Sequence, residues 1–333
     1  MILNLKNKRI LLICSKFFNY EKEIKKELED QGATVDYFDE RFGNTFFIKS
    51  IIRLRIKILV NYLSNKYYLK ILENIKDENY DIILFISPET VTNFAMEQLK
   101  RNFKNSKFIL YMWDSFKNKK ESKRLVKYFD KVYSFDKKDC EKYKMNFLPL
   151  FYIDKYNKKF QKIEDKYDIS FIGTGHEDRF SIINKIQDNL KNSNMNNYFF
   201  LFLQSKKIYF FRKIFDKRLK NAKLGDFHFK SLSHEEIADI SKKSKAILDI
   251  QRDIQSGLTM RTIEIALGMR KKLITTNSDI MKYDFYNENN ILIIDRKNPI
   301  IKKEFLENEY IALDEKIYQK YSIKNWIKNI FEI

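Results

Sequence analysis

The sequence is poor in cysteine, histidine, glycine and proline, and several of these shortages exclude a class of protein. The two cysteines, Cys14 and Cys140, form neither a disulfide framework nor a Cys-x-x-Cys pair. The three histidines, His176, His228 and His234, lack the spacing of zinc ligands. No uncharged apolar stretch reaches about 18 residues, so we expect no helix that spans a membrane.

The N-terminus lacks the charged leader, long apolar segment and cleavage site of a signal peptide. Met1 is instead followed almost directly by a short strand-like run over residues 9–13. Because cysteines are also scarce, we expect the chain to be cytoplasmic.

Acidic residues are also too few to balance the basic ones. The 333 residues include 45 Asp and Glu against 64 Lys and Arg, a formal net charge of +19. Part of this excess is typical of an AT-rich coding sequence, but a basic surface still attracts nucleic acid, anionic lipid or phosphorylated substrates. No helix-turn-helix, zinc-finger or RNA-recognition signature is present, so we expect no nucleic-acid partner, and a basic nucleic-acid-binding protein stays an alternative.

The length predicts two domains, and the first shows short apolar runs that alternate with helical patterns. Fully apolar strands separated by helices indicate an α/β fold with a parallel sheet that is covered on both faces. We therefore predict a Rossmann-like domain over residues 1–150. Its expected helices cover 19–31, 46–77, 90–103 and 120–128, and its expected strands cover 9–14, 35–38, 81–86, 107–112 and 131–135.

The same alternation restarts after a polar stretch and predicts a second Rossmann-like, doubly wound domain over residues 151–314. A last helix is expected over 315–331. Two such domains face each other across a cleft, where ligands of open α/β sheets bind. The expected strands of the second domain cover 168–172, 199–203, 246–250, 272–276 and 291–294.

Two glycine-containing turns are candidates for anion binding. Five of the seven glycines lie between 173 and 268, and the turn 173–175 follows a strand and precedes a helix. Gly257 stands where the chain enters a predicted helix over 258–267, whose free N–H groups would attract a diphosphate. Arg261 and Glu264 share one face of that helix, either as ligands of a nucleotide or as an ordinary surface ion pair.

These segments resemble the GT-B glycosyltransferases of bacterial capsule, exopolysaccharide and lipopolysaccharide synthesis, and the spore-maturation-type proteins related to them. The residues that carry the resemblance are 111–115, 168–175, 255–277, 284–286 and 290–291. The resemblance implies a nucleotide-sugar donor bound by the second domain, an acceptor bound by the first, a final helix over 315–333 that crosses back to the first domain, and no metal. The donor-binding residues that we assign are Gly173, Thr174, Gly175, Ser256, Gly257, Leu258, Thr259, Arg261 and Glu264.

One departure from the family concerns the mechanism. Many retaining members carry two glutamates eight positions apart, and Glu264 matches the second, whereas Ser256 stands at the first. The retaining mechanism is therefore not supported. An inverting transfer needs a base, and Asp114 and Glu89, which follow predicted strands, are the catalytic candidates. The alternative is that both are helix-cap or turn residues.

Two segments concentrate the positive charge and are candidates for contact with an anionic membrane surface. An amphipathic helix over 46–63 would align Lys49, Arg53 and Lys57 on one face. Residues 206–223 hold eight basic residues and one acid, interleaved with aromatic residues. The alternative is an ordinary packed helix with solvated lysines. The membrane candidates of the second segment are Lys206, Lys207, Arg212 and Lys213.

Taken together, the sequence predicts a glycosyltransferase that moves a sugar from a nucleotide sugar to a glycan or lipid-linked acceptor in bacterial surface polysaccharide synthesis. We expect a peripheral location at the inner face of the membrane. A non-catalytic relative that binds a sugar nucleotide is the second alternative, and a sugar-nucleotide epimerase of the same fold is less expected.

Overall fold

The computed structural model describes residues 5–54, 56–157, 164–175, 178–191, 193–251 and 257–332. The chain divides into two compact units. Unit 1 comprises residues 1–150 together with 323–333, and unit 2 comprises residues 151–322.

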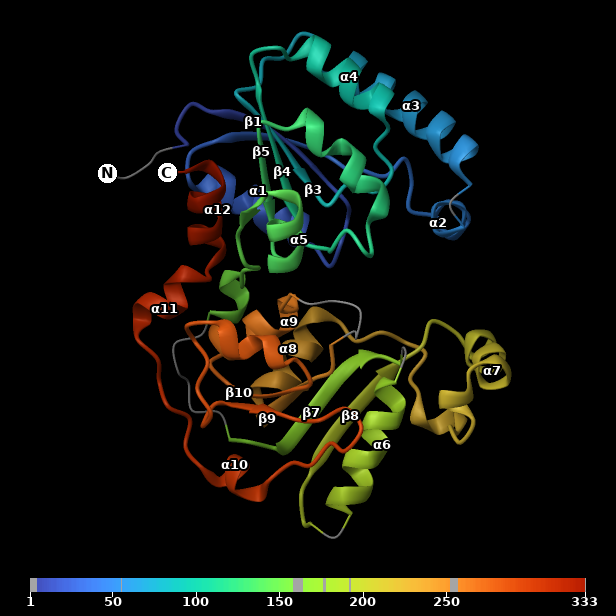
Figure 1. Ribbon diagram of the computed structural model, residues 1–333, viewed down its shortest axis with the longest axis vertical. Coiled ribbons are helices and arrows are strands. Elements are labelled where there is room, and N and C mark those ends of the chain that lie inside the picture. The colour runs from blue at the N-terminus through green and yellow to red at the C-terminus, as the bar shows by residue number, and fades with distance from the viewer. Residues whose placement is uncertain are drawn as a thin grey trace. The chain divides into compact units, whose positions relative to one another are not determined.

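Unit 1 is built on a six-stranded parallel sheet in the order β2-β1-β3-β4-β5-β6 (Figure 1). The central strands are apolar throughout because helices cover both faces of the sheet. The predicted strands all form, and a sixth, two-residue strand at the edge was missed. The strands are β1 (Arg9–Cys14), β2 (Thr34–Phe38), β3 (Ile82–Ile86), β4 (Lys107–Met112), β5 (Lys131–Ser134) and β6 (Asn146–Phe147).

Three helices of unit 1, α2, α4 and α5, begin at polar caps. Thr92 and Asp136 accept hydrogen bonds from the first turns of their helices, as N-cap residues do. Buried side chains such as Tyr68 and Met96 pack in one core cluster with the strands. The helices are α1 (Tyr20–Asp30), α2 (Phe46–Arg53), α3 (Lys57–Asn74), α4 (Asn93–Asn102), the 3-10 helix η1 (Lys120–Tyr128), α5 (Lys137–Tyr143) and α12 (Ile323–Phe331).

Unit 2 has a five-stranded parallel sheet in the order β11-β10-β9-β7-β8, and all five strands were predicted (Figure 1). The strands are β7 (Tyr167–Thr174), β8 (Asn197–Phe202), β9 (Ser244–Asp249), β10 (Lys272–Thr275) and β11 (Ile291–Ile293). The α-helices are α6 (Arg179–Leu190), α7 (Lys206–Phe215), α8 (His234–Lys242), α9 (Met260–Ile263), α10 (Lys303–Glu307) and α11 (Glu315–Lys320).

Two predicted helices are each divided in the structure. The helix expected over 46–77 divides into α2 and α3, of which α2 buries Ile51 and Ile52 and α3 becomes buried only from Ser64 onward. The helix expected over 315–331 divides into α11 and α12. The Tyr321 carbonyl between them accepts a hydrogen bond from the Tyr152 N–H at 2.9 Å and so leaves the helical pattern.

Trp326 anchors α12 on unit 1. Its ring is buried and meets the ring of Tyr111 edge-on, with centroids 4.8 Å apart. We expect Trp326→Ala to lower the free energy of unfolding by about 3–5 kcal/mol, because it removes a large buried side chain. Lys324→Ala, at an exposed position of the same helix, should change it by less than about 0.5 kcal/mol. Urea unfolding followed by far-ultraviolet circular dichroism measures the free energy of unfolding of both variants without relying on tryptophan fluorescence. Equal effects of the two substitutions would contradict the anchoring role.

Candidate functional site

Arginine side chains connect the carboxyl ends of the strands in unit 2. Arg179, the first residue of α6, donates to the carbonyl of Ile250 after β9 at 2.9 Å. It also donates to the carbonyl and hydroxyl oxygens of Thr174 at the end of β7, at 3.2 and 3.0 Å. Because parallel strands end at one edge, a single guanidinium holds two neighbouring strand ends together.

Two further arginines lie at the same edge. Arg261 donates to the carbonyl of Ile172 in β7. Arg296, which follows β11, pairs with both carboxylate oxygens of Asp178 at 2.7 and 3.0 Å and donates to the Gln251 carbonyl at 2.8 Å. All three guanidiniums are half-buried. Arginine in such a setting is well suited to bind the oxygens of a diphosphate.

The start of α9 is closed by threonine hydroxyls. Thr259 accepts from the N–H of Thr262 at 3.1 Å, which is N-cap geometry, and donates to Asp249 at 2.8 Å. The Thr262 hydroxyl donates to the same carboxylate oxygen at 2.5 Å. The Thr259 hydroxyl predicted to meet a ligand is therefore already engaged within the fold, and the backbone N–H groups are the part of this turn that faces a ligand in our assignment.

Glu264 begins a π-helical turn over Glu264–Gly268 that continues α9. The predicted α-helix over 258–267 is thus four α-helical residues followed by a wider turn, closed by the Met269 N–H on the Glu264 carbonyl at 2.7 Å. Glu264 is only 8% exposed. A buried carboxylate on the same helical segment as Arg261 is a strong hydrogen-bond acceptor for ligand hydroxyls.

Packing explains two of the glycines. A Cβ at Gly173 would lie 2.7 Å from the ring of Phe171, and one at Gly175 would lie 2.7 Å from the ring of Phe227. Packing against these rings favours glycine at both positions whether or not a ligand approaches, so the glycines of the turn 173–175 are not by themselves a sign of a ligand. Among the other assigned residues, Gly257 accepts from Gln251 at 2.9 Å, Leu258 is buried, and Ser256 lies outside the described residues.

Asp114 lies at the carboxyl edge of the sheet in unit 1, two residues after β4. The neighbouring ring of Trp113 lies 5.9 Å from that of Phe17, which is half-exposed and follows β1. The N–H of Trp113 donates to the hydroxyl of Ser87 at 2.7 Å, and Ser87 has a left-handed φ of 43°. Strained backbone of this kind gathers at functional sites, so the edge near Asp114 is a candidate for acceptor contact.

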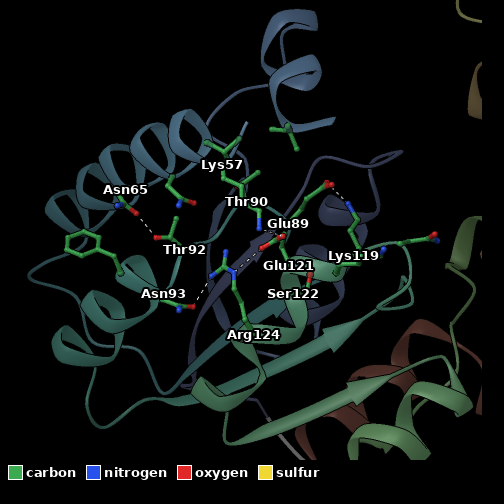
Figure 2. A pocket seen from close by; sticks show the side chains of 16 residues that line it. Lys57, Asn65, Glu89, Thr90, Thr92, Asn93, Lys119, Glu121, Ser122 and Arg124 are labelled. Atoms are coloured by element: carbon green, nitrogen blue, oxygen red, sulfur yellow. Dashed lines mark hydrogen bonds and ion pairs between the residues drawn. The ribbon is translucent and has the colours of Figure 1, made fainter. Parts of the chain in front are cut away.

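Glu89, the second catalytic candidate, lines a cavity of unit 1 (Figure 2). Its carboxylate pairs with Lys119 and, at 3.3 Å, with Arg41. Burial alone would raise the pKa of Glu89, but the two cations outweigh it and lower the pKa. A lowered pKa makes the Glu89 carboxylate a weaker base, and its two ion pairs leave it better suited to accept hydrogen bonds than to remove a proton.

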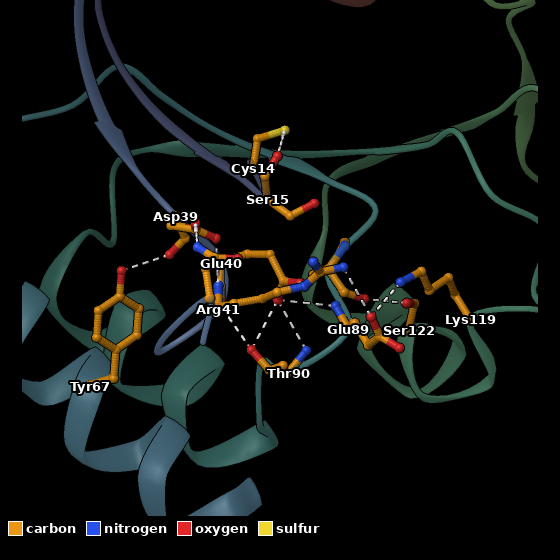
Figure 3. Close-up of polar contacts among 12 residues, drawn as sticks. Cys14, Ser15, Asp39, Glu40, Arg41, Tyr67, Glu89, Thr90, Lys119 and Ser122 are labelled. Carbon is orange, nitrogen blue, oxygen red and sulfur yellow. Dashed lines mark hydrogen bonds and ion pairs between the residues drawn. The ribbon is translucent and has the colours of Figure 1, made fainter. Parts of the chain in front are cut away.

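A fully buried carboxylate that the sequence analysis missed, Glu40, positions the Glu89 loop (Figure 3). It accepts from the N–H groups of Glu89 and Thr90 at 3.1 and 3.0 Å and from the Thr90 hydroxyl at 3.0 Å. Burial raises the pKa of Glu40, opposed by the neighbouring Arg41. The sequence feature that could have identified Glu40 is the charged run 39–41, which directly follows a predicted strand.

The two basic segments differ from the prediction. The single helix expected over 46–63 is divided, so Lys49 and Arg53 belong to α2 and Lys57 begins α3. The side chains of Lys49 and Arg53 lie outside the described residues, and Lys57 lines the cavity 3.6 Å from Glu121.

In α7, Lys206 and Lys207 are exposed as expected. Two other assigned cations bond within the fold instead. Arg212 donates to the Gly175 carbonyl and pairs with Asp216 at 3.1 Å, and Lys213 donates to the Ala222 carbonyl at 2.7 Å. The exposed face of α7 is strongly apolar, with exposed fractions of 55% for Phe210, 64% for Phe211, 76% for Ile214 and 71% for Phe215.

Sequence analysis also missed Arg179 and Arg296. Arg296 follows the predicted strand 291–294 by two residues and Arg179 follows the predicted strand 168–172 by seven, and these positions were the signal that could have found them. Among the described residues, no group of three or more histidine, cysteine or acidic side chains is placed to hold a metal ion. In the same residues, no helix has the length and apolar character needed to cross a bilayer.

No family model matches the chain, and no curated protein matches its sequence. Solved structures are similar over nearly its whole length. The apo form of lipopolysaccharide outer core galactosyltransferase WaaB is 10% identical with a TM-score of 0.56, over 97% of this chain and 99% of that one. Anabaena Alr3699/HepE in complex with UDP and glucose is 11% identical with a TM-score of 0.59, over 98% and 99%.

A third similar structure is the UDP-GlcNAc 2-epimerase of Methanocaldococcus jannaschii in complex with UDP-GlcNAc and UDP. It is 10% identical with a TM-score of 0.54, over 98% of this chain and 99% of that one. At such identities the similarity shows the fold. The expected GT-B arrangement, two Rossmann-like α/β units in one chain, is confirmed.

Asp216 should make the stability of unit 2 sensitive to acid. Hydrogen bonds from Arg218, partly opposed by burial, and from Arg212 lower the pKa of Asp216 to about 2 from an ordinary value of 3.8. A lowered pKa of an acid stabilises the fold above the ordinary value, and this stabilisation is lost as the pH falls toward 2. Asp216→Asn should therefore cost about 2 kcal/mol at pH 7, and the difference from the unsubstituted chain should shrink below pH 4.

Urea midpoints at pH 7 and pH 3 measure this effect. Asp239→Asn is the matched control, because Asp239 forms an exposed ion pair with Lys243 and should contribute less than about 0.5 kcal/mol. A cost for Asp216→Asn that stays constant between the two pH values would contradict the assignment.

Proposed function

We propose that this chain is a glycosyltransferase that moves a sugar from a nucleotide-sugar donor to an acceptor hydroxyl. The observation that carries the proposal is the edge of unit 2, where three half-buried arginines lie and where the buried carboxylate Glu264 follows Arg261 by three residues. Similar folds solved with UDP and glucose or with UDP-GlcNAc support a nucleotide-sugar ligand. A role in bacterial surface polysaccharide synthesis, with a glycan or lipid-linked acceptor, is the finer part of this proposal.

The donor is assigned to unit 2. Arg261, Arg179 and Arg296 would bind the diphosphate, together with the backbone N–H groups at Gly257 and Leu258. Glu264 would accept hydrogen bonds from the ribose hydroxyls. As the bond between the anomeric carbon and the diphosphate breaks, negative charge grows on the diphosphate, and the arginines stabilise it without rearrangement.

The acceptor is assigned to unit 1. The acceptor hydroxyl attacks the anomeric carbon and passes its proton to Asp114, while the nucleoside diphosphate leaves. Glu89, with its two cationic neighbours, would orient the acceptor by hydrogen bonds. The arginines supply the positive charge that a metal ion would otherwise provide, so we propose that transfer needs no divalent metal.

An epimerase is the second candidate function, because one of the similar structures is a UDP-GlcNAc 2-epimerase. Both functions use a nucleotide sugar as substrate, but only the transferase needs an acceptor. Product analysis of the same nucleotide sugar with and without acceptor separates them, since an epimerase converts the sugar without any acceptor.

We further propose that α7 places this enzyme on the surface of an anionic membrane. Four large apolar side chains, more than half exposed, lie between the exposed cations Lys206 and Lys207 and the basic residues of the next turn. Apolar side chains enter the boundary between headgroups and acyl chains, while lysines bind the lipid phosphates. The inner face of the membrane is the surface that we assign.

Glu264→Ala should raise the KM for the nucleotide sugar roughly tenfold or more, because the ribose loses a buried acceptor. The KM of Glu264→Gln should lie between those of Glu264→Ala and the unsubstituted chain. Glu304→Ala, at an exposed position of α10, should leave the KM unchanged. A panel of nucleotide sugars, tested by thermal shift and by transfer in the presence of EDTA, measures this. The proposal fails if no nucleotide sugar raises the melting temperature and Glu264→Ala transfers as well as the unsubstituted chain.

Replacing the four apolar residues of α7 by serine should weaken binding to phosphatidylglycerol vesicles at least about tenfold, because their burial supplies much of the free energy. The control replaces three other exposed apolar residues of unit 2, Met281, Ile300 and Ile311, by serine. Co-sedimentation with anionic and with neutral vesicles is the measurement. Equal binding of both variants would count against α7 as the contact.

A further inference from the structure

A cavity of about 410 Å³ lies in unit 1 between the start of α3, the start of α4 and the loop that leads into η1 (Figure 2). Its size is within the range of about 300–1,000 Å³ that small-molecule sites have. Glu89 and Thr90, held in place by the buried Glu40, form part of its wall. The cavity is therefore built on a loop that the core fixes.

The wall of the cavity is charged, with an excess of positive charge. Four cationic side chains and two carboxylates line it. The carboxylate of Glu121 lies between Arg124 at 3.3 Å and Lys57 at 3.6 Å. The Arg124 guanidinium is fixed further by the Val91 carbonyl at 2.7 Å. The charged groups are thus pre-arranged, so a ligand would meet them with little loss of side-chain freedom.

Several polar groups of the wall are left for a ligand. In the part of the chain that the structure describes, the side chains of Asn61, Asn118 and Lys120 make no hydrogen bond or ion pair. The ring of Phe94, at the start of α4, is 40% exposed and also lines the cavity. Amides and carboxylates suit sugar hydroxyls, an aromatic ring suits the apolar face of a pyranose, and an unpaired lysine suits an acidic group.

We propose that this cavity binds a sugar that carries an acidic group, either a carboxylate or a phosphate, as part of the acceptor. This inference deepens the proposed function and rests on it, because only a transferase has an acceptor. Glu89, Glu121 and the free amides bind the hydroxyls, Phe94 packs against the ring, and Lys120 pairs with the acid. A neutral sugar would leave the excess positive charge of the wall uncompensated.

The test is a calorimetric titration of the full chain with glucuronic acid, glucose 6-phosphate, methyl glucoside and inorganic phosphate. At least one of the two acidic sugars should bind about tenfold or more tightly than methyl glucoside, and inorganic phosphate should bind no better than the neutral sugar. Whichever acidic sugar binds identifies the acidic group. Equal affinities for the acidic and the neutral sugars would overturn the proposal.

Matched variants separate the cavity from the general charge of the protein. Lys120→Gln should weaken binding of the acidic sugar about tenfold. Lys127→Gln removes the same charge from the same helix outside the cavity and should leave binding unchanged. Phe94→Ala should weaken acidic and neutral sugars alike. If Lys120→Gln and Lys127→Gln act equally, the attraction is non-specific and the proposal is wrong.

The titration needs no donor, so its outcome is independent of the nucleotide site. Selective binding of an acidic sugar by a chain that binds no nucleotide sugar would support the cavity assignment and overturn the proposed transfer. Nucleotide-sugar binding without any preference for an acidic sugar would overturn the cavity assignment alone.

Discussion

All strands within each sheet run parallel, so the carboxyl ends of the strands lie at one edge of the sheet. The polar loops that follow the strands gather at that edge. Backbone carbonyls at such an edge have no strand partner and need donors from elsewhere. In unit 2 arginines supply them, through Arg179, Arg261 and Arg296. In unit 1 the roles are reversed, because the Glu40 carboxylate accepts from the N–H groups of the β3–α4 loop. At both edges, charged side chains therefore form the hydrogen bonds that the backbone groups of the loops would otherwise lack.

The same arginines that stabilise the strand ends of unit 2 are the ones that we propose bind the diphosphate. A guanidinium has five donors, and the bonds to carbonyls use only some of them. These bonds hold each guanidinium in a fixed position at the edge, and a fixed cation is the condition for stabilising a growing negative charge in the proposed transfer. Glu89 shows the opposite use of charge, since its two cationic partners make it a poor base and a good fixed acceptor. In our proposal the same edge chemistry thus serves an anion in unit 2 and the acceptor hydroxyls in unit 1.

The sequence predicts what local patterns determine. The apolar run 107–112 coincides with β4, and Arg261 and Glu264 were found because they lie close together in the chain. The residues that were missed depend on distant contacts. Arg179 and Arg296 reach the site only because β7, β9, β10 and β11 are neighbours in the sheet, and Glu40 finds its partners 50 residues away. The cavity is formed by three segments whose proximity no local pattern reveals.

The π turn at Glu264 has a consequence for evolution and for engineering. Such a turn holds one residue more than the α-helical turn it replaces, so the number of residues in the turn sets the direction in which the Glu264 carboxylate points. Deleting a single residue within Glu264–Gly268 would restore the regular helix and rotate the side chains before the deletion by about 100° relative to those after it. A point substitution in this segment changes one buried contact, whereas a change in its length shifts every contact on one side of it, and homologous chains should be aligned here without gaps.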